Sequence, residues 1–589
     1  MTDPADALAA AQEQLAALQA QVEALRAQLS QQAADAPAAE AAEGSSSVEV
    51  ASAVEETAVG DQTRSAGAAA AGPLGPAGAE AVRAGYAFSA PALELGALVD
   101  GVALPEVRVR VPIGMLNRHG LVAGATGTGK TRTLQLIAEQ LSANGVPVFA
   151  ADVKGDLSGV ATPGTSSERL LARTASIGQD WTPAAFPTEF YSLGGRGTGI
   201  PIRATVSSFG PLLLSRILGL NETQESSLGL VFHYADEAGL PLLDLSDLRA
   251  VLTYLVSDEG KAELAELGGL SKATAGVILR ELIAFADQGA DAFFGEPEID
   301  TELLLRQAPD GRGVISLLEI PEVYDQPAVF STFLMWLLAD LFESLPEVGD
   351  TERPKLVFFF DEAHLLFRGA SKDFLASIVA TVRLIRSKGV GIVFVTQSPK
   401  DLPNDVLAQL GSRVQHQLRA HTPDDAKALR AAVGTFPRSG YDLEEVLTAL
   451  PTGEAIVTVM NEDGAPSPVA WTRMRAPQAS MAPTDPAALA AQVAASPLAA
   501  RYGTPIDRES ARELLAAKMN ASLTKQPPTP RADDPGDEAY RRAKEQYERS
   551  ARRTTTRRRS TSTTERVIGS AIQTTVNGVL RGVLKNLFR

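Results

Sequence analysis

The pattern of hydrophobic and polar residues changes at about Ala92, where short apolar runs begin to alternate with stretches of helical periodicity. Residues 107–111 alternate as a short strand does. Residues 120–123 and 146–151 are typical of buried strands, and the segment between them, through Leu141, has helical spacing. A strand–helix–strand order implies parallel strands. We therefore predict an α/β fold with a mainly parallel sheet.

Further along, this alternation is lost and then returns, which predicts a helical insertion inside one α/β domain of residues 92–475. The insertion covers about 207–295 and shows only helical periodicity. Its expected helices are 212–220, 225–238, 245–255 and 274–288. After it, the expected strands are 313–318, 356–360, 391–396, 413–418 and 454–459. The expected helices there are 328–343, 372–387 and 423–433.

The N-terminal region differs from this domain. Over residues 1–30, apolar side chains repeat every seven residues, which predicts a short coiled coil. The two heptad positions hold Leu8, Leu15, Val22 and Leu29, and Ala11, Leu18 and Leu25. Two interpretations stay open: a helix that binds a protein partner, or an Ala- and Gln-rich helix of little specificity. Residues 31–91 are rich in small residues, Pro and Glu, and predict a disordered linker.

The C-terminal region is basic, whereas the rest of the chain is acidic. The expected segments are an extension at 476–535 with one helix near 507–519, a basic disordered segment at 536–566 and an amphipathic helix at 567–589. The net charge is −17 in total and +8 over residues 536–589. An acidic centre argues against a surface that coats nucleic acid, but not against basic residues lining a pore. For the tail, a tether, a DNA anchor and a membrane-surface role stay open.

Composition excludes several kinds of chemistry. The chain has 589 residues and no cysteine, so disulfides, Cys-ligated metals and a Cys nucleophile are ruled out. The longest apolar stretch, 328–345, is interrupted by Ser331, Thr332 and Asp340 and predicts a buried helix, not a membrane span. The N-terminus lacks a basic stretch followed by an apolar one, so no signal peptide is expected. We expect a cytoplasmic protein with no integral membrane segment.

A glycine-rich motif between the predicted strand 120–123 and the helix after it carries the strongest chemical signal. It fits GxxxxGK[ST], the pattern of a phosphate-binding loop. Glycines let backbone N–H groups surround phosphates, Lys130 reaches the β- and γ-phosphates, and the Thr131 hydroxyl binds Mg²⁺. The residues expected to bind the nucleotide are Gly124, Ala125, Thr126, Gly127, Thr128, Gly129, Lys130, Thr131 and Arg132.

An acid pair after a second apolar strand complements this loop. Residues 356–360 are all apolar, and Asp361 and Glu362 follow them directly. We expect Asp361 to act at the metal and Glu362 to act as a general base toward the attacking water. Alone, the pair would be an ordinary acidic helix start, but the phosphate-binding loop favours a catalytic role. His364 could pack or relay a proton.

Polar residues around the strand 391–396 are weaker candidates. Gln397 ends that strand and could sense the γ-phosphate or orient water, or could be a solvated strand end. Arg383 and Arg386 precede the strand, together with Lys388. An arginine that reaches across a subunit boundary can stabilise transition-state charge, whereas a solvated basic helix end is the simpler interpretation.

Taken together, these stretches resemble the HerA-like helicase branch of the HerA/FtsK ATPases, and in particular the YjgR-type bacterial proteins. The resemblance runs from about residue 92 to 519, plus the apolar tail. It lies in NRHGLVAGATGTGKT (117–131), ADVKGDLSGVA (151–161), RATVSSFGPLLLSRILGLN (203–221), FFGEP (293–297), KLVFFFDEAHLLF (355–367), the segment 383–425 and DRESA (507–511).

The resemblance implies a RecA-like P-loop core that forms a homo-hexameric ring, with ATP and Mg²⁺ at the subunit interfaces. It supports the roles given above and adds Arg118 to Arg383 and Arg386 as candidates for an arginine that contacts the neighbour's nucleotide. Asp152 and Asp156 match a family motif of less certain role. HerA translocases have a β-barrel before the loop, and about thirty residues here are too few for one.

Three functions follow from these features. The leading one is an Mg²⁺-dependent ATPase whose ring translocates on or pumps DNA. The second is an ATP-driven motor or switch that acts on a protein partner without a direct DNA role, which the acidic centre supports. The third is a nucleotide-dependent scaffold, which the intact set of candidate catalytic residues disfavours.

Overall fold

The computed structural model describes residues 72–524, except 265–267, 321–326, 350 and 368–371. The chain divides into two units, residues 1–68 and 69–589, and the described residues all belong to the second. The predicted coiled coil at 1–30, most of the linker, the basic segment and the amphipathic tail lie outside the described residues. They remain predictions.

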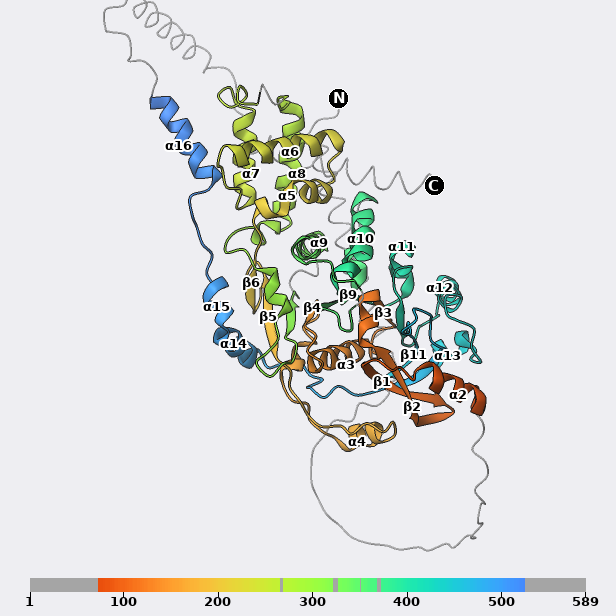
Figure 1. Ribbon diagram of the computed structural model, residues 1–589. Coiled ribbons are helices and arrows are strands. Elements are labelled where there is room, and N and C mark those ends of the chain that lie inside the picture. The colour runs from red at the N-terminus through yellow and green to blue at the C-terminus, as the bar shows by residue number, and fades with distance from the viewer. Residues whose placement is uncertain (1–71, 265–267, 321–326, 350, 368–371, 525–589) are drawn as a thin grey trace, which may run out of the picture. The chain divides into compact units, whose positions relative to one another are not determined.

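Within the described residues, one twelve-stranded sheet organises the fold (Figure 1). Its order is β2-β1-β12-β11-β10-β3-β9-β8-β4-β7-β5-β6. The strands are β1 (Ala92–Asp100), β2 (Val102–Pro112), β3 (Gly120–Ala123), β4 (Val148–Asp152), β5 (Thr188–Leu193), β6 (Ile200–Ile202), β7 (Ile315–Glu319), β8 (Leu356–Phe360), β9 (Val390–Thr396), β10 (Ser412–Gln415), β11 (Glu454–Thr458) and β12 (Ala470–Met474).

The sheet is parallel over most of its width and antiparallel at one end. From β10 to β6 every neighbouring pair is parallel, and β2, β1, β12, β11 and β10 pair antiparallel. The mainly parallel α/β sheet is therefore confirmed. Because β3, β9, β8 and β4 are adjacent and parallel, their carboxyl ends meet at one edge, where ligands bind in such sheets.

Helices connect and cover the strands. They are α2 (Gly75–Gly85), α3 (Lys130–Ala143), α4 (Glu168–Ala175), α5 (Val206–Ile217), α6 (Glu222–Glu237), α7 (Leu245–Leu255), α8 (Lys272–Asp287), α9 (Pro327–Ser344), α10 (Lys372–Ile385), α11 (Asn404–Leu407), α12 (Pro423–Val433), α13 (Leu443–Ala449), α14 (Pro486–Ala495), α15 (Pro497–Tyr502) and α16 (Ala511–Thr524). Capping boxes define where some begin: Asn221 with Gln224 for α6, and Thr422 with Asp425 for α12.

Alternate side chains of the central strands enter two separate cores, one on each face of the sheet. Phe358 and Phe360 of β8 belong to the core that includes α9, α10 and the insertion helices. Val357 and Phe359 belong to the core that includes α3 and the β1–β2 hairpin. Both faces are covered, so these strands are apolar throughout, as the sequence predicts for buried parallel strands.

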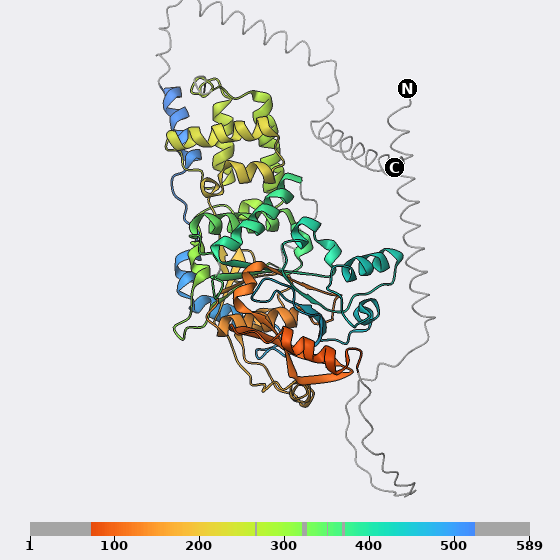
Figure 2. The same cartoon turned by 45° about the vertical axis from the view of Figure 1, so that its right-hand side comes forward.

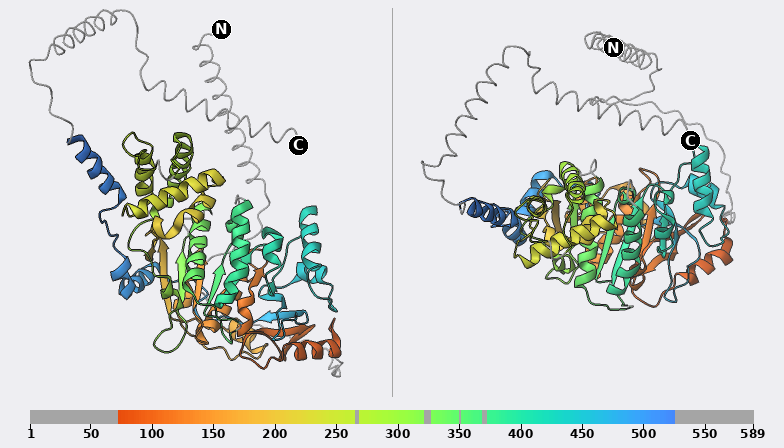
Figure 3. Two further views of the ribbon diagram at one scale, coloured as in Figure 1. Left: turned by 45° about the horizontal axis from the view of Figure 1, so that its top comes forward. Right: turned by 90° about the horizontal axis from the view of Figure 1, so that it is seen from above.

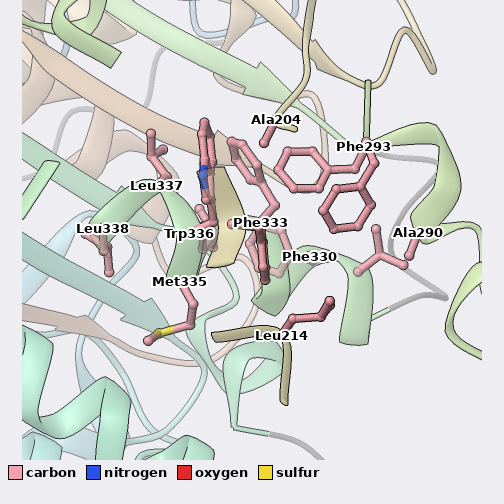
Figure 4. Packing of buried hydrophobic residues seen from close by; sticks show 14 of the residues in the cluster. Ala204, Leu214, Ala290, Phe293, Phe330, Phe333, Met335, Trp336, Leu337 and Leu338 are labelled. Atoms are coloured by element: carbon pink, nitrogen blue, oxygen red, sulfur yellow. The ribbon is translucent and has the colours of Figure 1, made fainter. Parts of the chain in front are cut away.

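Helices α5 to α8 occupy the segment predicted as a helical insertion, and Figures 2 and 3 show them gathered together. The insertion joins the sheet domain through an aromatic cluster (Figure 4). Phe293, after α8, packs 5.4 Å from Phe333 and 5.6 Å from Trp336 of α9, measured between ring centroids. Aromatic pairs of this kind stabilise the packing beyond the burial of their apolar surface.

Two parts of the sequence-based assignment need correction. Residues 72–91 are not a disordered linker, because helix α2 forms there and Tyr86 is buried with its hydroxyl 3.0 Å from the carbonyl oxygen of Val457. The small residues of α2 pack on the β1–β2 hairpin, so few large side chains are needed. Strand β10 ends at Gln415, earlier than the predicted 418. The hairpin adds to the sheet edge, and no closed barrel is present in the described part of the chain.

Candidate nucleotide-binding site

The glycine-rich motif forms a loop between β3 and α3, as the sequence predicts. Three of its glycines, Gly124, Gly127 and Gly129, have φ values of 155°, 82° and 115°. Side chains there would be strained, and a Cβ at Gly124 would lie 2.5 Å from the Cβ of His416. Helix α3 begins at Lys130, so its N-terminus and free N–H groups open into the loop.

Lys130 lies inside this loop. Its Nζ donates to the carbonyl oxygens of Gly124, at 2.6 Å, and Ala125, at 3.1 Å. Burial lowers the pKa of Lys130 below its ordinary value, although the nearby Glu362 carboxylate acts in the opposite direction. The ammonium thus occupies the space that the loop encloses, which is where phosphate oxygens bind in a loop of this kind.

Strand β8 delivers the acid pair to the same edge of the sheet. Asp361 and Glu362 are 4% and 2% exposed. Glu362 has a left-handed backbone (φ 47°), which is costly for a residue other than glycine and accumulates at functional sites. Its N–H donates to Asp361 Oδ1 at 2.9 Å, and its Oε2 lies 3.3 Å from Nδ1 of His364. The structure therefore brings the acid pair close to Lys130 of the phosphate-binding loop, with His364 next to Glu362.

A cluster of carboxylates at this edge is suited to a divalent cation. One oxygen each of Asp152, Asp156 and Asp361 lies within 4.8 Å of the others. The Thr131 hydroxyl donates to Asp156 Oδ2 at 3.3 Å. Asp361 Oδ2 is buried without a hydrogen-bond partner. Burial, and then the charge of Glu362, raises the pKa of Asp361 to about 7. A buried, unpartnered carboxylate oxygen among hard oxygen ligands fits Mg²⁺.

The loop after β4 contributes residues to which sequence reasoning gave no definite role. Asp152 accepts backbone N–H bonds from Lys154, Gly155 and Leu157 at 3.2, 2.8 and 2.8 Å, which fixes the loop. Lys154 then forms an ion pair with Glu362 Oε1. In the sequence, Lys154 was marked only by its place in ADVKGDLSGVA (151–161), one of the stretches that carry the family resemblance.

Gln397 follows β9 and lies at the same edge, exposed, in a cleft of about 330 Å³. Ala125, Thr126 and Arg419 also line this cleft, and Arg419 Nη2 donates to the Thr126 carbonyl at 3.4 Å. Arg419 was not singled out from the sequence. Arg132 is half-buried in the first turn of α3, where it donates to Gln135 Oε1 at 3.1 Å.

The three candidate arginines lie at the opposite edge of the sheet. Arg118 ends the 3₁₀ helix η1 (Ile113–Arg118) just before β3. Arg383, in the last turn of α10, and Arg386, in η8 (Arg386–Lys388), precede β9. Since β3 and β9 are parallel neighbours, all three precede the amino ends of strands whose carboxyl ends carry the loop and Gln397. The structure thus separates them from the site of their own chain.

The loop joined to α3 and the acid pair on β8 define a P-loop NTPase. The family model described as helicase HerA-like C-terminal matches residues 100–589. The chain therefore belongs to the HerA-like helicase family, which confirms the resemblance seen in the sequence, and it is an ATP-hydrolysing enzyme. In the part of the chain that the structure describes, no helix is both long and apolar enough to cross a membrane.

Two relatives carry the name DNA double-strand break repair helicase HerA. The one from Sulfolobus acidocaldarius is 22% identical over 377 residues, 63% of this chain and 67% of that protein. The one from Sulfurisphaera tokodaii is 22% identical over 374 residues, with coverage of 63% and 67%. Plasmid coupling protein TrwB in complex with an ATP analogue aligns at 16% identity and a TM-score of 0.46, covering 67% of this chain and 97% of TrwB.

Proposed function

We propose that this protein is an Mg²⁺-dependent ATPase whose subunits assemble into a ring and move DNA. One observation carries the catalytic part: the buried acid pair of β8 lies beside the phosphate-binding loop, with Glu362 in contact with Lys154 and Asp361 among the carboxylates near Thr131. Family membership supports the motor, and the relatives named as DNA repair helicases support DNA as its substrate.

Each residue of the site has a distinct task in this proposal. Loop N–H groups and Lys130 bind the phosphates of ATP. Thr131 and Asp361, with Asp156 beside them, would hold Mg²⁺, which supplies charge neutralisation to the phosphates. Glu362 accepts a proton from the attacking water, because it is a buried carboxylate next to the loop. Gln397 is the candidate that senses the γ-phosphate or orients that water.

The test of the catalytic assignment compares two variants. Glu362→Gln removes the base but preserves the shape of the side chain, so we expect ATP binding to persist while turnover falls by about 10²–10⁴-fold. Lys130→Ala should abolish binding or turnover because the phosphates lose their cation. Binding is measured with a fluorescent ATP analogue and turnover by phosphate release. Normal turnover by Glu362→Gln would refute the role of this residue.

The ring is proposed because the three arginines that the family resemblance marks as candidates lie at the opposite edge of the sheet from the phosphate-binding loop of their own chain. Arg118, Arg383 and Arg386 precede strands β3 and β9, whereas the loop follows β3. In a ring, one of these arginines would contact the nucleotide of the neighbouring subunit and stabilise the transition-state charge. Sedimentation of the protein with and without an ATP analogue measures this assembly directly.

A second candidate is a motor that acts on a protein partner. The total charge of −17, with the positive excess confined to the C-terminal residues, favours it over a protein that coats DNA. ATPase activity measured with and without DNA, at several salt concentrations, separates the two. A DNA motor should be stimulated, and its apparent DNA affinity should fall as salt rises. ATPase activity indifferent to DNA at low salt would favour the protein partner.

A further inference from the structure

Lys154 makes a contact in the nucleotide site that conflicts with the catalytic role proposed for its partner. Its Nζ forms an ion pair with Oε1 of Glu362, the carboxylate proposed as the general base. The other oxygen, Oε2, has Nδ1 of His364 at 3.3 Å. The ammonium group occupies Oε1 and neutralises the charge of the carboxylate, which disfavours proton transfer from water to Glu362 even though Oε2 has no hydrogen-bond partner.

The backbone of Lys154 is fixed, but its side chain can move. The Asp152 carboxylate accepts hydrogen bonds from the N–H groups of Lys154, Gly155 and Leu157, and Asp152 itself is fully buried. The Lys154 side chain, in contrast, is 42% exposed, whereas that of Glu362 is 3% exposed. Four rotatable methylene groups on an anchored backbone allow the ammonium group to change partners while Glu362 stays in place.

The phosphate site is close enough to attract this ammonium group. Burial is the largest cause of the lowered pKa of Lys130, and the charge of Lys154 adds to it, so the two ammonium groups lie near each other. The carboxylates of Asp361 and Asp156 also act on Lys154. ATP brings a highly charged γ-phosphate to the loop that Lys130 occupies, and a lysine near the edge of that loop gains a second anionic partner.

We propose that Lys154 is a positioning residue that responds to the γ-phosphate. It binds Glu362 when the site holds no γ-phosphate, and it moves to the γ-phosphate when ATP binds, which frees the Glu362 carboxylate to accept a proton from water. This inference rests on the proposed role of Glu362 as the base. It couples the activation of Glu362 to the arrival of the γ-phosphate.

Equilibrium binding tests the proposal without any need for turnover. The affinities for ADP and for the non-hydrolysable analogue AMPPNP, both with Mg²⁺, are measured in the full chain. In Lys154→Met we expect AMPPNP to bind about tenfold more weakly, because one charged contact with the γ-phosphate is lost, while ADP binding changes less than about twofold. Lys154→Arg should restore part of the preference for AMPPNP, because it keeps the positive charge.

Lys261→Met is the matched control. Lys261 also pairs with a carboxylate, Asp258 at 2.7 Å, but it belongs to the helical insertion and is exposed. Both affinities should be unchanged there. Glu362→Gln provides the converse test: Lys154 then leaves a neutral amide and not a carboxylate, so the preference for AMPPNP over ADP should increase.

An unchanged preference for AMPPNP over ADP in Lys154→Met would overturn the proposal, because Lys154 would then stay on Glu362 or serve only the fold. Equal weakening of both nucleotides would also overturn it. These outcomes are distinct from failure of the catalytic assignment, which is read from turnover by Glu362→Gln and does not depend on the binding ratio. Thermal melting of each variant verifies that it is folded.

Discussion

The two edges of the parallel sheet differ in the kind of buried polar group that they leave without a hydrogen-bond partner. At the carboxyl edge, Asp361 Oδ2 and Glu362 Oε2 are buried without hydrogen-bond partners. At the amino edge, the buried His119 uses both ring nitrogens: Nε2 donates to the Val382 carbonyl at 2.6 Å, and Nδ1 accepts from Ile392 N–H at 3.0 Å. The carboxyl edge therefore holds unpartnered carboxylate oxygens, which suit a cation, whereas the unpartnered atoms of the amino edge, Asn117 Oδ1 and Ser412 Oγ, belong to neutral groups.

The amino edge also carries the three candidate arginines, which precede β3 and β9. His119 connects β3, β9 and α10, so it fixes the segments that carry Arg118, Arg383 and Arg386. A four-residue strand is roughly 13 Å long, so these segments start a strand's length away from their own loop. Of the three, Arg383 is exposed, whereas Arg118 and Arg386 are half-buried. In the proposed ring, the amino edge of one subunit would meet the carboxyl edge of its neighbour.

The largest effect is expected from removing the arginine that, in the proposed ring, would contact the nucleotide of the neighbouring subunit. Arg383→Ala or Arg386→Ala should lower turnover by about 10³-fold or more, because transition-state charge is left without its partner. Arg118→Ala tests the third candidate arginine by the same measurement. Turnover is measured on the assembled protein.

Mixed assemblies then separate an effect across the interface from one within a chain. Subunits with Lys130→Ala retain the arginines, and subunits with Arg383→Ala or Arg386→Ala retain the loop. Mixing the two should restore part of the activity, since some interfaces then have both components. Full activity in a dilute monomer would contradict the comparison between the edges.

A smaller effect is expected for the cation at the carboxyl edge. Asp361→Asn removes the unpartnered carboxylate and should weaken Mg²⁺ binding in the presence of ADP by about 10–100-fold. Asp152→Asn should lower thermal stability more than Mg²⁺ affinity, because Asp152 already accepts three backbone N–H groups. Mg²⁺ titration by calorimetry measures both. Equal losses of Mg²⁺ affinity would contradict this division of tasks.

The smallest effect concerns pH, and the two edges should respond in opposite directions. Burial lowers the pKa of His119 to about 4 from 6.5, so its contribution to stability is present above pH 6.5 and is lost as the pH falls toward 4. At pH 5 the free energy of unfolding is lower by about 2 kcal/mol for this reason. Asp361, with a pKa raised to about 7, instead favours folding at low pH and opposes it as the pH rises from about 4 to 7.

Denaturant unfolding at pH 5 and pH 7 measures this contrast. His119→Asn keeps a residue that tolerates the left-handed φ of 62° and should reduce the loss of stability at pH 5. Asp361→Asn should reduce the loss of stability that occurs as the pH rises toward 7. The difference between the two pH values is the quantity compared, since each substitution also changes the absolute stability.

The sequence predicted the central fold well, because strands buried on both faces are apolar throughout. Strand 356–360 and helix 423–433 match β8 and α12 in full. The prediction failed where tertiary contacts replace local signals. Helix α2 has few large side chains and depends on its packing against the hairpin, and the three-residue β6 is too short to show a period.

The candidate site was predictable where a motif fixes the spacing, as in the loop around Lys130 and the pair at the end of β8. The partners of these residues were not predictable, since Lys154 meets Glu362 from a different strand, and only the order of β4 beside β8 brings them together. The roles of Gln397 and the arginines remain predictions, because they depend on a nucleotide and a neighbouring subunit.

The antiparallel end of the sheet has a consequence for how the chain is made. Strand β1, near the start of the described residues, pairs with β12, near their end, with Gly96 opposite Met474. At a synthesis rate of roughly 5–20 residues per second, β1 leaves the ribosome on the order of tens of seconds before its partner. During that time the β1–β2 hairpin exposes an unpaired edge that could recruit other strands. A chain that stops before residue 470 would lack β12 and would leave this edge of β1 unpaired.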